Sequence, residues 1–482
     1  MDGNRKHSNA YNHILKCIGL FGSVQGLITL GTLLRSVVVA NLLGTAGVGI
    51  NDAFNKTLNL VRSTTDLGIG FSAVKKISEY YSQDKTDAML ETIEMVRSWA
   101  FVTAAFGMAL CIVMAPLFSL WTFDGDYNYT LSFLLLSPVV ACSAITGAEV
   151  AVLKATRKLG KVAFSQLLAV ISSIVISVPV IWKFRLLGIV PSLVLVSVAG
   201  MVVTVVYSFR EFPYKLAVFS KQTYSRGGEM IKLGVFYTVA AFFGSGSFAV
   251  ISNWLVKESA EIAGLYSTAY LFVTYLGMFV FSAADSDYFP RLSASFRSRM
   301  QINALANRQS EVSLLLIAPM ILVFIFAVPY FVSVFFNEQF MEAVPIAQAA
   351  SISLFFKAVT MPVAYISLAK GDSKIYLLQE FLYDVAVVAA VILGYRLFSS
   401  EGIGYAIAAA GALDWIIVSA VAYFCYGYVP GKKEMRIFVI QGLVVACGWL
   451  LSVYFDSWLE LCTGTAVCIS SCLISYYFLK NE

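Results

Sequence analysis

Charged residues are scarce in this sequence. They make up 13% of its 482 residues, whereas a soluble domain averages about 25%. Hydrophobic residues make up 59%, and blocks such as 314–336 (LLLIAPMILVFIFAVPYFVSVFF) exceed the ~20 residues that cross a ~30 Å hydrocarbon core. The blocks are continuous, unlike the alternating strands of an outer-membrane barrel. The predicted fold class is therefore an all-α polytopic membrane protein.

Several residue types and motifs needed for catalysis are also missing. The only histidines are His7 and His13, and the eight cysteines form no close metal-ligand pair, so we expect no metal or redox site. No G-x-x-x-x-G-K-[ST] loop occurs, and no predicted loop is large enough for an ATPase fold. The sequence therefore predicts a protein that is not an enzyme and has no catalytic residues. It predicts no cofactor beyond coupling H⁺ or Na⁺, and no nucleic-acid partner.

Hydropathy predicts about fourteen membrane-spanning helices. No cleavage site precedes the first span, so it is expected to stay in the mature protein. The predicted spans are 17–42, 50–72, 99–121, 131–153, 162–182, 186–209, 231–254, 263–289, 312–336, 345–369, 375–397, 402–425, 436–455 and 458–479.

The basic residues divide unevenly between the predicted loops. With the N-terminus in the cytoplasm, 26 of the 34 lysines and arginines fall in or beside cytoplasmic segments and four in external loops. Positive charge favours the cytoplasmic side, and a missed central helix would invert every later loop. We therefore predict fourteen spans with both termini cytoplasmic; twelve would follow if the last pair were a hairpin.

The long loop 210–230 divides the first six spans from the rest. A weak repeat supports this division, because AGVGIND (46–52) and IAGLYST (262–268) each begin the second span of a half. Six spans per half would make the halves parallel repeats. The predicted parts are an N-terminal lobe (1–220), a C-terminal lobe (221–430) and a C-terminal helix pair (431–482).

The second predicted span carries a polar stripe. At 100° per residue, its polar residues fall within an arc of about 120°, and Ala53, Phe54, Leu60 and Val61 form a back compatible with lipid. The stripe consists of Asp52, Asn55, Lys56, Asn59, Arg62 and Asp66.

Two interpretations of these charges remain open. Asp52–Lys56 and Arg62–Asp66 are both spaced i,i+4, so they could neutralise each other as structural ion pairs. Alternatively, intramembrane charges often line a substrate path. Arg35 and Lys357 lack a local carboxylate partner in sequence, and these cations together predict an electropositive cavity. Such a cavity suits an anionic ligand, above all one bearing phosphate.

Intramembrane carboxylates form a second candidate set. Buried acids can take up H⁺ or Na⁺ and couple transport to an ion gradient. Glu149, Glu380 and Asp384 lie near the predicted cytoplasmic ends of spans, where solvated acids are ordinary. The candidate ion-coupling residues are Asp52, Asp66, Glu380, Asp384 and Asp414.

The stretch around these charges resembles a known family. R-x-x-x-x-A-x-x-x-G (35–44) is followed by G-x-G (47–49) and DLGIGFSAVKKISEYY (66–81), and YFPRLSAS (288–295) closes the eighth predicted span. This pattern is similar to that of the polysaccharide flippases of the MOP exporter superfamily, which translocate O-antigen, lipopolysaccharide and capsule repeat units. The resemblance implies two six-helix lobes around a central cavity that opens alternately to each side of the bacterial inner membrane.

The resemblance also implies a substrate, an undecaprenyl-diphosphate-linked oligosaccharide that moves from the cytoplasmic to the outer leaflet. RSVVVAN (35–41) and NDAF (51–54) match places where lipid II flippases carry cavity residues, so Arg35 and Asp52 inherit a cavity role. Ser36 and Asn41 replace an acid and an arginine of that family, and GSVQGLITL (22–30) lacks another arginine. These departures argue against lipid II and leave Gln25 as a sugar contact.

The resemblance further implies a groove for the lipid tail at 436–479. The expected protein is a monomer whose partners are its lipid-linked substrate, membrane lipids and other polysaccharide-assembly proteins. Two rivals remain: a multidrug/cation antiporter of the same superfamily, which should carry acids rather than cations in its cavity, and a membrane-embedded polysaccharide polymerase or ligase. The short external loops count against the second rival. The candidate cavity residues are Gln25, Arg35, Asp52, Asn55, Lys56, Asn59, Arg62 and Lys357.

Overall fold

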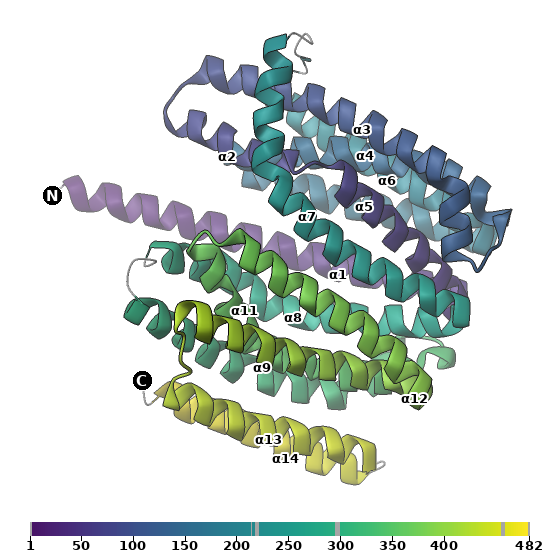
Figure 1. The fold of residues 1–482 in the computed structure, drawn as a ribbon, viewed down its shortest axis with the longest axis vertical. Coiled ribbons are helices and arrows are strands. Elements are labelled where there is room, and N and C mark those ends of the chain that lie inside the picture. The colour runs from purple at the N-terminus through teal and green to yellow at the C-terminus, as the bar shows by residue number, and fades with distance from the viewer. Residues whose placement is uncertain (1, 214, 217–220, 295–298, 455–457, 481–482) are drawn as a thin grey trace. The chain divides into compact units, whose positions relative to one another are not determined.

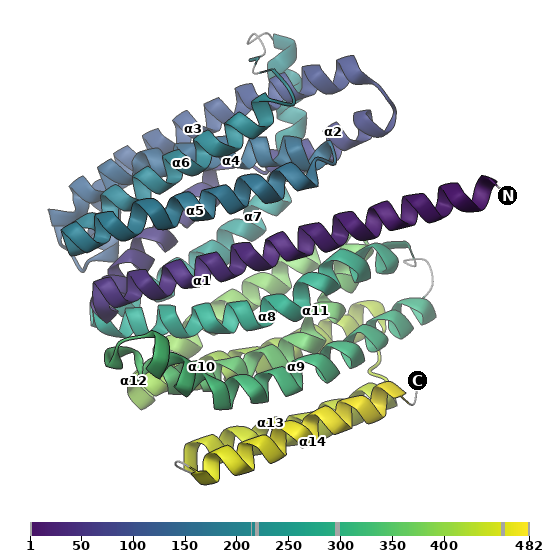
Figure 2. The same cartoon turned by 180° about the vertical axis from the view of Figure 1, so that it is seen from behind.

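All the regular secondary structure of the described residues is helical. The computed structural model describes residues 2–480 except 214, 217–220, 295–298 and 455–457, and within them no strand occurs (Figures 1 and 2). The α-helices are α1 (Asp2–Thr65), α2 (Ile69–Ser82), α3 (Thr86–Thr122), α4 (Thr130–Ala155), α5 (Leu159–Phe184), α6 (Ile189–Phe209), α7 (Lys221–Glu258), α8 (Ala260–Ala294), α9 (Arg299–Phe335), α10 (Ala343–Ser351), α11 (Ser353–Ala369), α12 (Ser373–Val421), α13 (Lys432–Tyr454) and α14 (Trp458–Lys480). Short 3₁₀ or π segments occupy Tyr127–Tyr129, Arg185–Gly188, Glu338–Phe340 and Ala422–Tyr426.

The length and apolar composition of these helices confirm a polytopic membrane protein. Among the described residues, eight segments are long and apolar enough to cross a bilayer, and those at 160–209 and 374–426 are 50 and 53 residues long. About 20 helical residues suffice for one crossing, so each of these two is long enough for two. The total of fourteen spans stays a prediction.

Two long helices break where the sequence predicted loops. In α1 the break lies at Gly44, whose φ of 71° is readily adopted only by glycine. In α12 it lies at Phe398 and Ser399. A Cβ on Gly402 would collide with the Gly394 carbonyl oxygen, so the two halves of α12 approach each other at these glycines. The predicted spans 375–397 and 402–425 are thus the two arms of α12.

The predicted span 50–72 is wrong at its C-terminal end. The helix stops at Thr65, and α2 starts afresh at Ile69. Leu67 and Gly68 between them have φ values of 49° and 64°, a left-handed conformation that ends a helix. Asp66 therefore lies in a turn and not on the polar stripe of the span.

The chain divides into two compact units. Unit 1 comprises residues 1–47 and 53–245, and unit 2 comprises residues 48–52 and 246–482. In unit 1, α3 packs on α4, α4 and α5 pack on α6, and α2 packs against α3 and α4. In unit 2, α12 packs on α10 and α11, while α9 contacts α8, α11, α13 and α14. The division of the chain at 220 and 430 stays a proposal.

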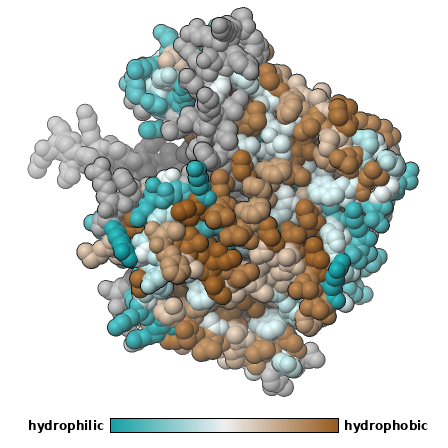
Figure 3. Space-filling view, viewed as in Figure 1, coloured by the Kyte–Doolittle hydropathy of each residue, from teal (hydrophilic) through white to brown (hydrophobic). Residues whose placement is uncertain are grey.

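The outer surface of unit 2 is suited to lipid. Leu393, Leu397 and Ile416 on α12 are 58%, 63% and 56% exposed. Figure 3 shows apolar side chains gathered over the middle of the face that carries α12, with hydrophilic ones toward its two ends. This distribution matches a helix that crosses a hydrocarbon layer between two aqueous interfaces.

Candidate functional site

The apolar side of the charged segment of α1 is buried in protein. Ala53, Thr57 and Leu58 are at most 2% exposed. The Phe54 ring lies 5.3 Å from the Phe123 ring and 5.2 Å from the Phe133 ring, in edge-to-face contact. The side that the sequence showed to be compatible with lipid is thus covered by aromatic residues of unit 1.

The polar side of the same segment points away from this core. Asn55 and Lys56 are half-buried, whereas Asn59 and Arg62 are exposed. The Arg62 Nη1 donates a hydrogen bond of 3.1 Å to the Asn59 Oδ1. Asp66 lies in the turn that follows and still interacts electrostatically with Arg62. The structure thus keeps Asn55, Lys56, Asn59 and Arg62 on one face, opposite the buried one.

Two other predicted residues of α1 have partners distant in sequence. The Arg35 Nε donates to the Ser177 Oγ of α5 at 3.1 Å, within unit 1. Asp52, within unit 2, accepts a hydrogen bond of 3.0 Å from the Ser252 Oγ of α7. Only the backbone of Gln25 is described, so its predicted role falls outside the described side chains.

Unit 2 contains a cavity that brings three of the predicted residues together. Its volume is about 300 Å³. Lys357 enters from α11, and Glu380 and Asp414 enter from the two arms of α12. The other lining residues are Phe281, Ser353, Thr360, Met361, Ala364, Tyr365, Tyr376, Gln379, Tyr383, Gly411 and Val418.

The cavity mixes one cation with two carboxylates. The Lys357 Nζ lies 5.6 Å from the centre of the Phe281 ring. Lys357 interacts electrostatically with both Glu380 and Asp414, and the two acids also interact with each other. An ammonium among carboxylates, hydroxyls and tyrosine rings can bind an anionic group or a sugar bearing many hydroxyls. The tyrosines of this cavity could not be identified from sequence, where only their general abundance was visible.

Asp384 lies next to this cavity and is 9% exposed. Its Oδ1 accepts a hydrogen bond of 2.8 Å from the Ser247 Oγ. Within the described part of unit 2, its Oδ2 and the Oε1 of the cavity residue Gln379 are buried with no hydrogen-bond partner. Buried acceptors normally have one, so the Asp384 carboxylate is suited to receive a proton or a cation, and the Gln379 amide oxygen is suited to bind a cation or to accept a hydrogen bond. The described residues nevertheless hold no cluster of three acids, histidines or cysteines that could bind one metal ion.

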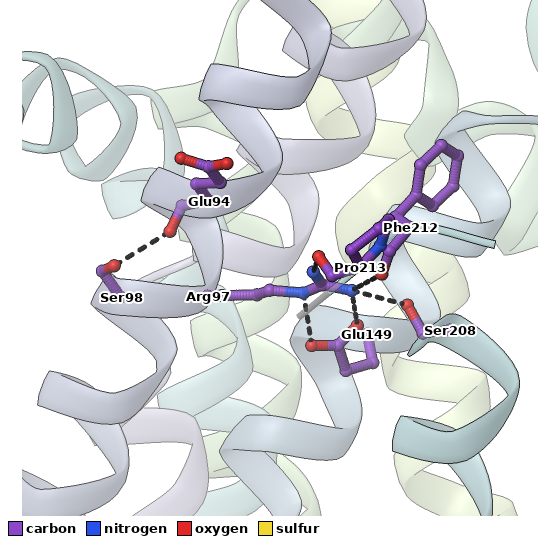
Figure 4. A network of polar contacts seen from close by, with 7 residues as sticks. All are labelled: Glu94, Arg97, Ser98, Glu149, Ser208, Phe212 and Pro213. Atoms are coloured by element: carbon purple, nitrogen blue, oxygen red, sulfur yellow. Dashed lines mark hydrogen bonds and ion pairs between the residues drawn. The ribbon is translucent and has the colours of Figure 1, made fainter. Parts of the chain in front are cut away.

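Unit 1 contains a buried charge network that was not predicted (Figure 4). The Arg97 guanidinium donates to both Glu149 oxygens, Nε to Oε1 at 2.9 Å and Nη2 to Oε2 at 3.2 Å. It also donates to the Ser208 Oγ and to the carbonyl oxygens of Phe212 and Pro213, at 2.8–3.3 Å. This network joins α3, α4 and the end of α6, so its role is to hold unit 1 together.

Comparisons with known proteins agree with this architecture. Residues 14–296 match a family described as "polysaccharide biosynthesis protein". No curated protein sequence matches the chain. The structure is similar to that of the lipid II flippase MurJ in an inward closed conformation, with a TM-score of 0.71 at 15% identity, covering 96% of this chain and 99% of that one.

Two transporter structures are also similar. An inward-facing multidrug resistance MATE family transporter of the MOP superfamily gives a TM-score of 0.70 at 12% identity, covering 83% of this chain and 94% of that one. A MOP superfamily transporter from Pyrococcus furiosus gives 0.61 at 11% identity, covering 85% and 94%. At these identities the similarity shows the fold, which is that of MOP superfamily transporters.

Proposed function

Because this chain belongs to the polysaccharide biosynthesis protein family, we propose that it is a flippase for an undecaprenyl-diphosphate-linked oligosaccharide repeat unit. It moves this lipid from the cytoplasmic to the outer leaflet of the bacterial plasma membrane by alternating access. The fold supports a transport role, since it is shared with a lipid II flippase and with MATE transporters. The proposed substrate class comprises the repeat units of O-antigen, lipopolysaccharide and capsule.

The observation that carries the proposal is the two-sided segment of α1. Its apolar side is buried in unit 1 (Phe54 2% and Val61 3% exposed), so Arg62 and Asn59 are displayed outward on a fixed helix face. Arginine binds phosphate oxygens through several N–H groups at once. In this proposal Arg35, Lys56, Arg62 and Lys357 attract the diphosphate or acidic sugars; Gln25, Asn55 and Asn59 contact sugar hydroxyls.

In this proposal the carboxylates couple transport to an ion gradient. Asp384 and Asp414, with Glu380, take up H⁺ or Na⁺, and Asp52 acts as a polar gate that Ser252 orients. The exchange of the ion biases the transporter between its two access states. Asp66, in its turn beside Arg62, belongs to the same set. The pair α13–α14 accommodates the lipid tail, and the protein works as a monomer alongside other assembly proteins.

The test is the location of the substrate in a strain that lacks this protein. Lipid-linked repeat units should accumulate in the cytoplasmic leaflet, inaccessible to an external membrane-impermeant lectin, and a plasmid copy should restore access. Normal surface polysaccharide in that strain would contradict the proposal.

A cation antiporter is the second candidate, and one observation favours it. The cavity of unit 2 has two carboxylates for one lysine, and acids attract cationic drugs. Efflux of a cationic dye from cells that overproduce the protein, lost in Asp414→Asn, would support this alternative. Dye efflux equal to that of cells without the protein would exclude it.

A further inference from the structure

A second pocket in unit 2 lies between α9 and the start of α13. Its volume is about 400 Å³, and none of its residues lines the cavity around Lys357. The wall on one side is α9, and the wall on the other is the start of α13. The lining residues are Ala304, Asn307, Arg308, Glu311, Gly431, Lys432 and Lys433.

Hydrogen bonds hold the chain segment that leads into this pocket. The Gly427 carbonyl accepts bonds from the Arg299 Nε and Nη2 at 3.1 and 2.9 Å and from the Asn303 Nδ2 at 3.2 Å. The Asn307 Nδ2 donates to the Val429 carbonyl at 3.2 Å. These bonds tie residues 427–429 to α9, so the segment before α13 is fixed before any ligand arrives.

The first turn of α13 is anchored as well. The Tyr428 hydroxyl donates to Glu434 at 3.0–3.1 Å, and the Gly431 amide donates to the same carboxylate at 3.2 Å. Burial, and next the Glu434 carboxylate, raise the pKa of Tyr428, which keeps its hydroxyl protonated as a donor. Glu434 is 2% exposed and turned into the protein. These donors therefore hold the Glu434 carboxylate on the inner side of α13, and it does not line the pocket.

The pocket itself has a positive balance. Arg308, Lys432 and Lys433 face a single carboxylate, Glu311, which lies 3.7 Å from the Lys433 Nζ. Arg308 and Lys432 are exposed. The first backbone amides of the 23-residue helix α13 add partial positive charge beside these side chains. Guanidinium, ammonium and helix amides together favour a phosphate group.

The outer face of α13 continues from this positive end into an apolar stripe. Lys432 and Arg436 lie within 40° of each other on the helix, and Val439 and Leu443 follow on the same face. Val439 and Leu443 are 50% and 67% exposed. Two cations at the end of an exposed apolar stripe match a phosphate headgroup with its acyl chains. A soluble anion would make no use of the stripe.

We propose that the pocket between α9 and the start of α13 binds the phosphate headgroup of an anionic membrane phospholipid. Arg308 and Lys432 contact the phosphate, Lys433 is positioned by Glu311 at its edge, and Val439 and Leu443 contact an acyl chain. This site is separate from the cavity of Lys357 and does not depend on the transported substrate.

The experiment uses the purified full-length protein in detergent, with phosphatidylglycerol and phosphatidylcholine as the probes. Native mass spectrometry measures how many molecules of each lipid are retained. The variant is R308Q/K432Q, with K432Q alone as a second variant, and size-exclusion chromatography checks folding. The matched control K374Q/R396Q removes two exposed positive charges from α12 in the same unit.

We expect the wild type and the control to retain phosphatidylglycerol over phosphatidylcholine. The double variant should lose retention by about thirtyfold, since each of the two cations near a membrane surface contributes about 1 kcal/mol to the attraction of anionic lipid, and about 1.4 kcal/mol corresponds to a factor of ten. Equal retention by wild type and both pocket variants would overturn the proposal. So would protection from heat by glycerol phosphate that equals the protection by phosphatidylglycerol at the same concentration, because a soluble phosphate would then suffice.

Discussion

Gly49 of α1 lies directly against Gly264 of α8. A Cβ on Gly49 would come within 2.9 Å of the Gly264 amide nitrogen and would collide with the Ala260 carbonyl oxygen. The two glycines belong to the two segments of the weak sequence repeat, AGVGIND (46–52) and IAGLYST (262–268). The absence of side chains at this point lets the backbones of α1 and α8 touch.

Replacement of Gly49 by alanine should therefore destabilise the protein. The added methyl group forces the two backbones apart, and overpacking of this kind costs about 1–3 kcal/mol. Gly26→Ala is the matched control on the same helix, because a Cβ there meets nothing within 4 Å. The check is the thermal unfolding midpoint of the purified protein. Equal midpoints for the two variants would contradict the close contact between Gly49 and the backbone of α8.

The Arg97–Glu149 pair predicts a strong difference between single and double variants. Both side chains are 1% exposed, so Arg97→Met leaves a buried, unpaired carboxylate, which costs about 3–5 kcal/mol. Arg97→Met with Glu149→Leu should recover much of this loss, and Lys154→Met, exposed on α4, should have little effect. Thermal unfolding of all three variants checks this. A double variant less stable than the single one would contradict the pairing.

Lys357 should be needed for transport beyond its effect on stability. Lys357→Met leaves Glu380 and Asp414 without their cation and should lower both the unfolding midpoint and transport. Adding Asp414→Asn should restore the midpoint but not transport. Lys374→Met, at the exposed start of α12, is the control. Transport restored in the double variant would mean that Lys357 only balances charge.

Arg62 is exposed and Leu58 is buried, so replacements of these two residues of α1 should have opposite effects. Arg62→Ala changes an exposed residue, so the unfolding free energy should move by no more than about 0.5 kcal/mol while transport falls. Leu58 is 2% exposed, and Leu58→Ala should cost about 2–5 kcal/mol. Unfolding and transport measured on the same preparations separate the two effects. Full transport by Arg62→Ala would exclude Arg62 from the substrate path.

Asp384→Asn should uncouple transport from the ion gradient. The amide oxygen still accepts the hydrogen bond from Ser247, so the local structure should persist, but the site can no longer exchange a proton or balance Na⁺. Transport in proteoliposomes with and without an imposed H⁺ or Na⁺ gradient is the measurement. Ser247→Ala serves as the control, since it removes the hydrogen bond and keeps the carboxylate. A gradient response equal to that of the wild type would remove Asp384 from the coupling set.

The sequence was informative where local periodicity decides the structure. Hydropathy predicted an all-α polytopic protein, and the 100° period correctly placed Asn59 and Arg62 on a face opposite Phe54 and Val61. It could not tell whether that apolar side meets lipid or protein, because both environments accept the same residues. Only the positions of Phe123 and Phe133 show that it meets protein.

Contacts distant in sequence could not be predicted. Arg97 lies just outside the predicted span 99–121, and nothing in the neighbouring sequence marks it as buried. Its burial depends on Glu149 and on carbonyls more than 100 residues further along the chain. The end of α1 at Thr65 was also missed, because the left-handed Leu67 and Gly68 lie within an otherwise helical pattern. The shared cavity of Lys357 and Asp414 could not be predicted either, because it forms only when the second arm of α12 folds back on the first.

The most direct test of the proposed flippase is translocation by the purified protein. Proteoliposomes would carry a lipid-diphosphate-linked oligosaccharide with a labelled sugar, and an external membrane-impermeant glycosidase would report how much of it reaches the outer leaflet. We predict nearly complete cleavage with the wild type, and cleavage limited to the outer leaflet both without protein and with Arg62→Ala/Lys357→Met. Cleavage by wild-type vesicles no greater than that of protein-free vesicles would contradict the proposed function.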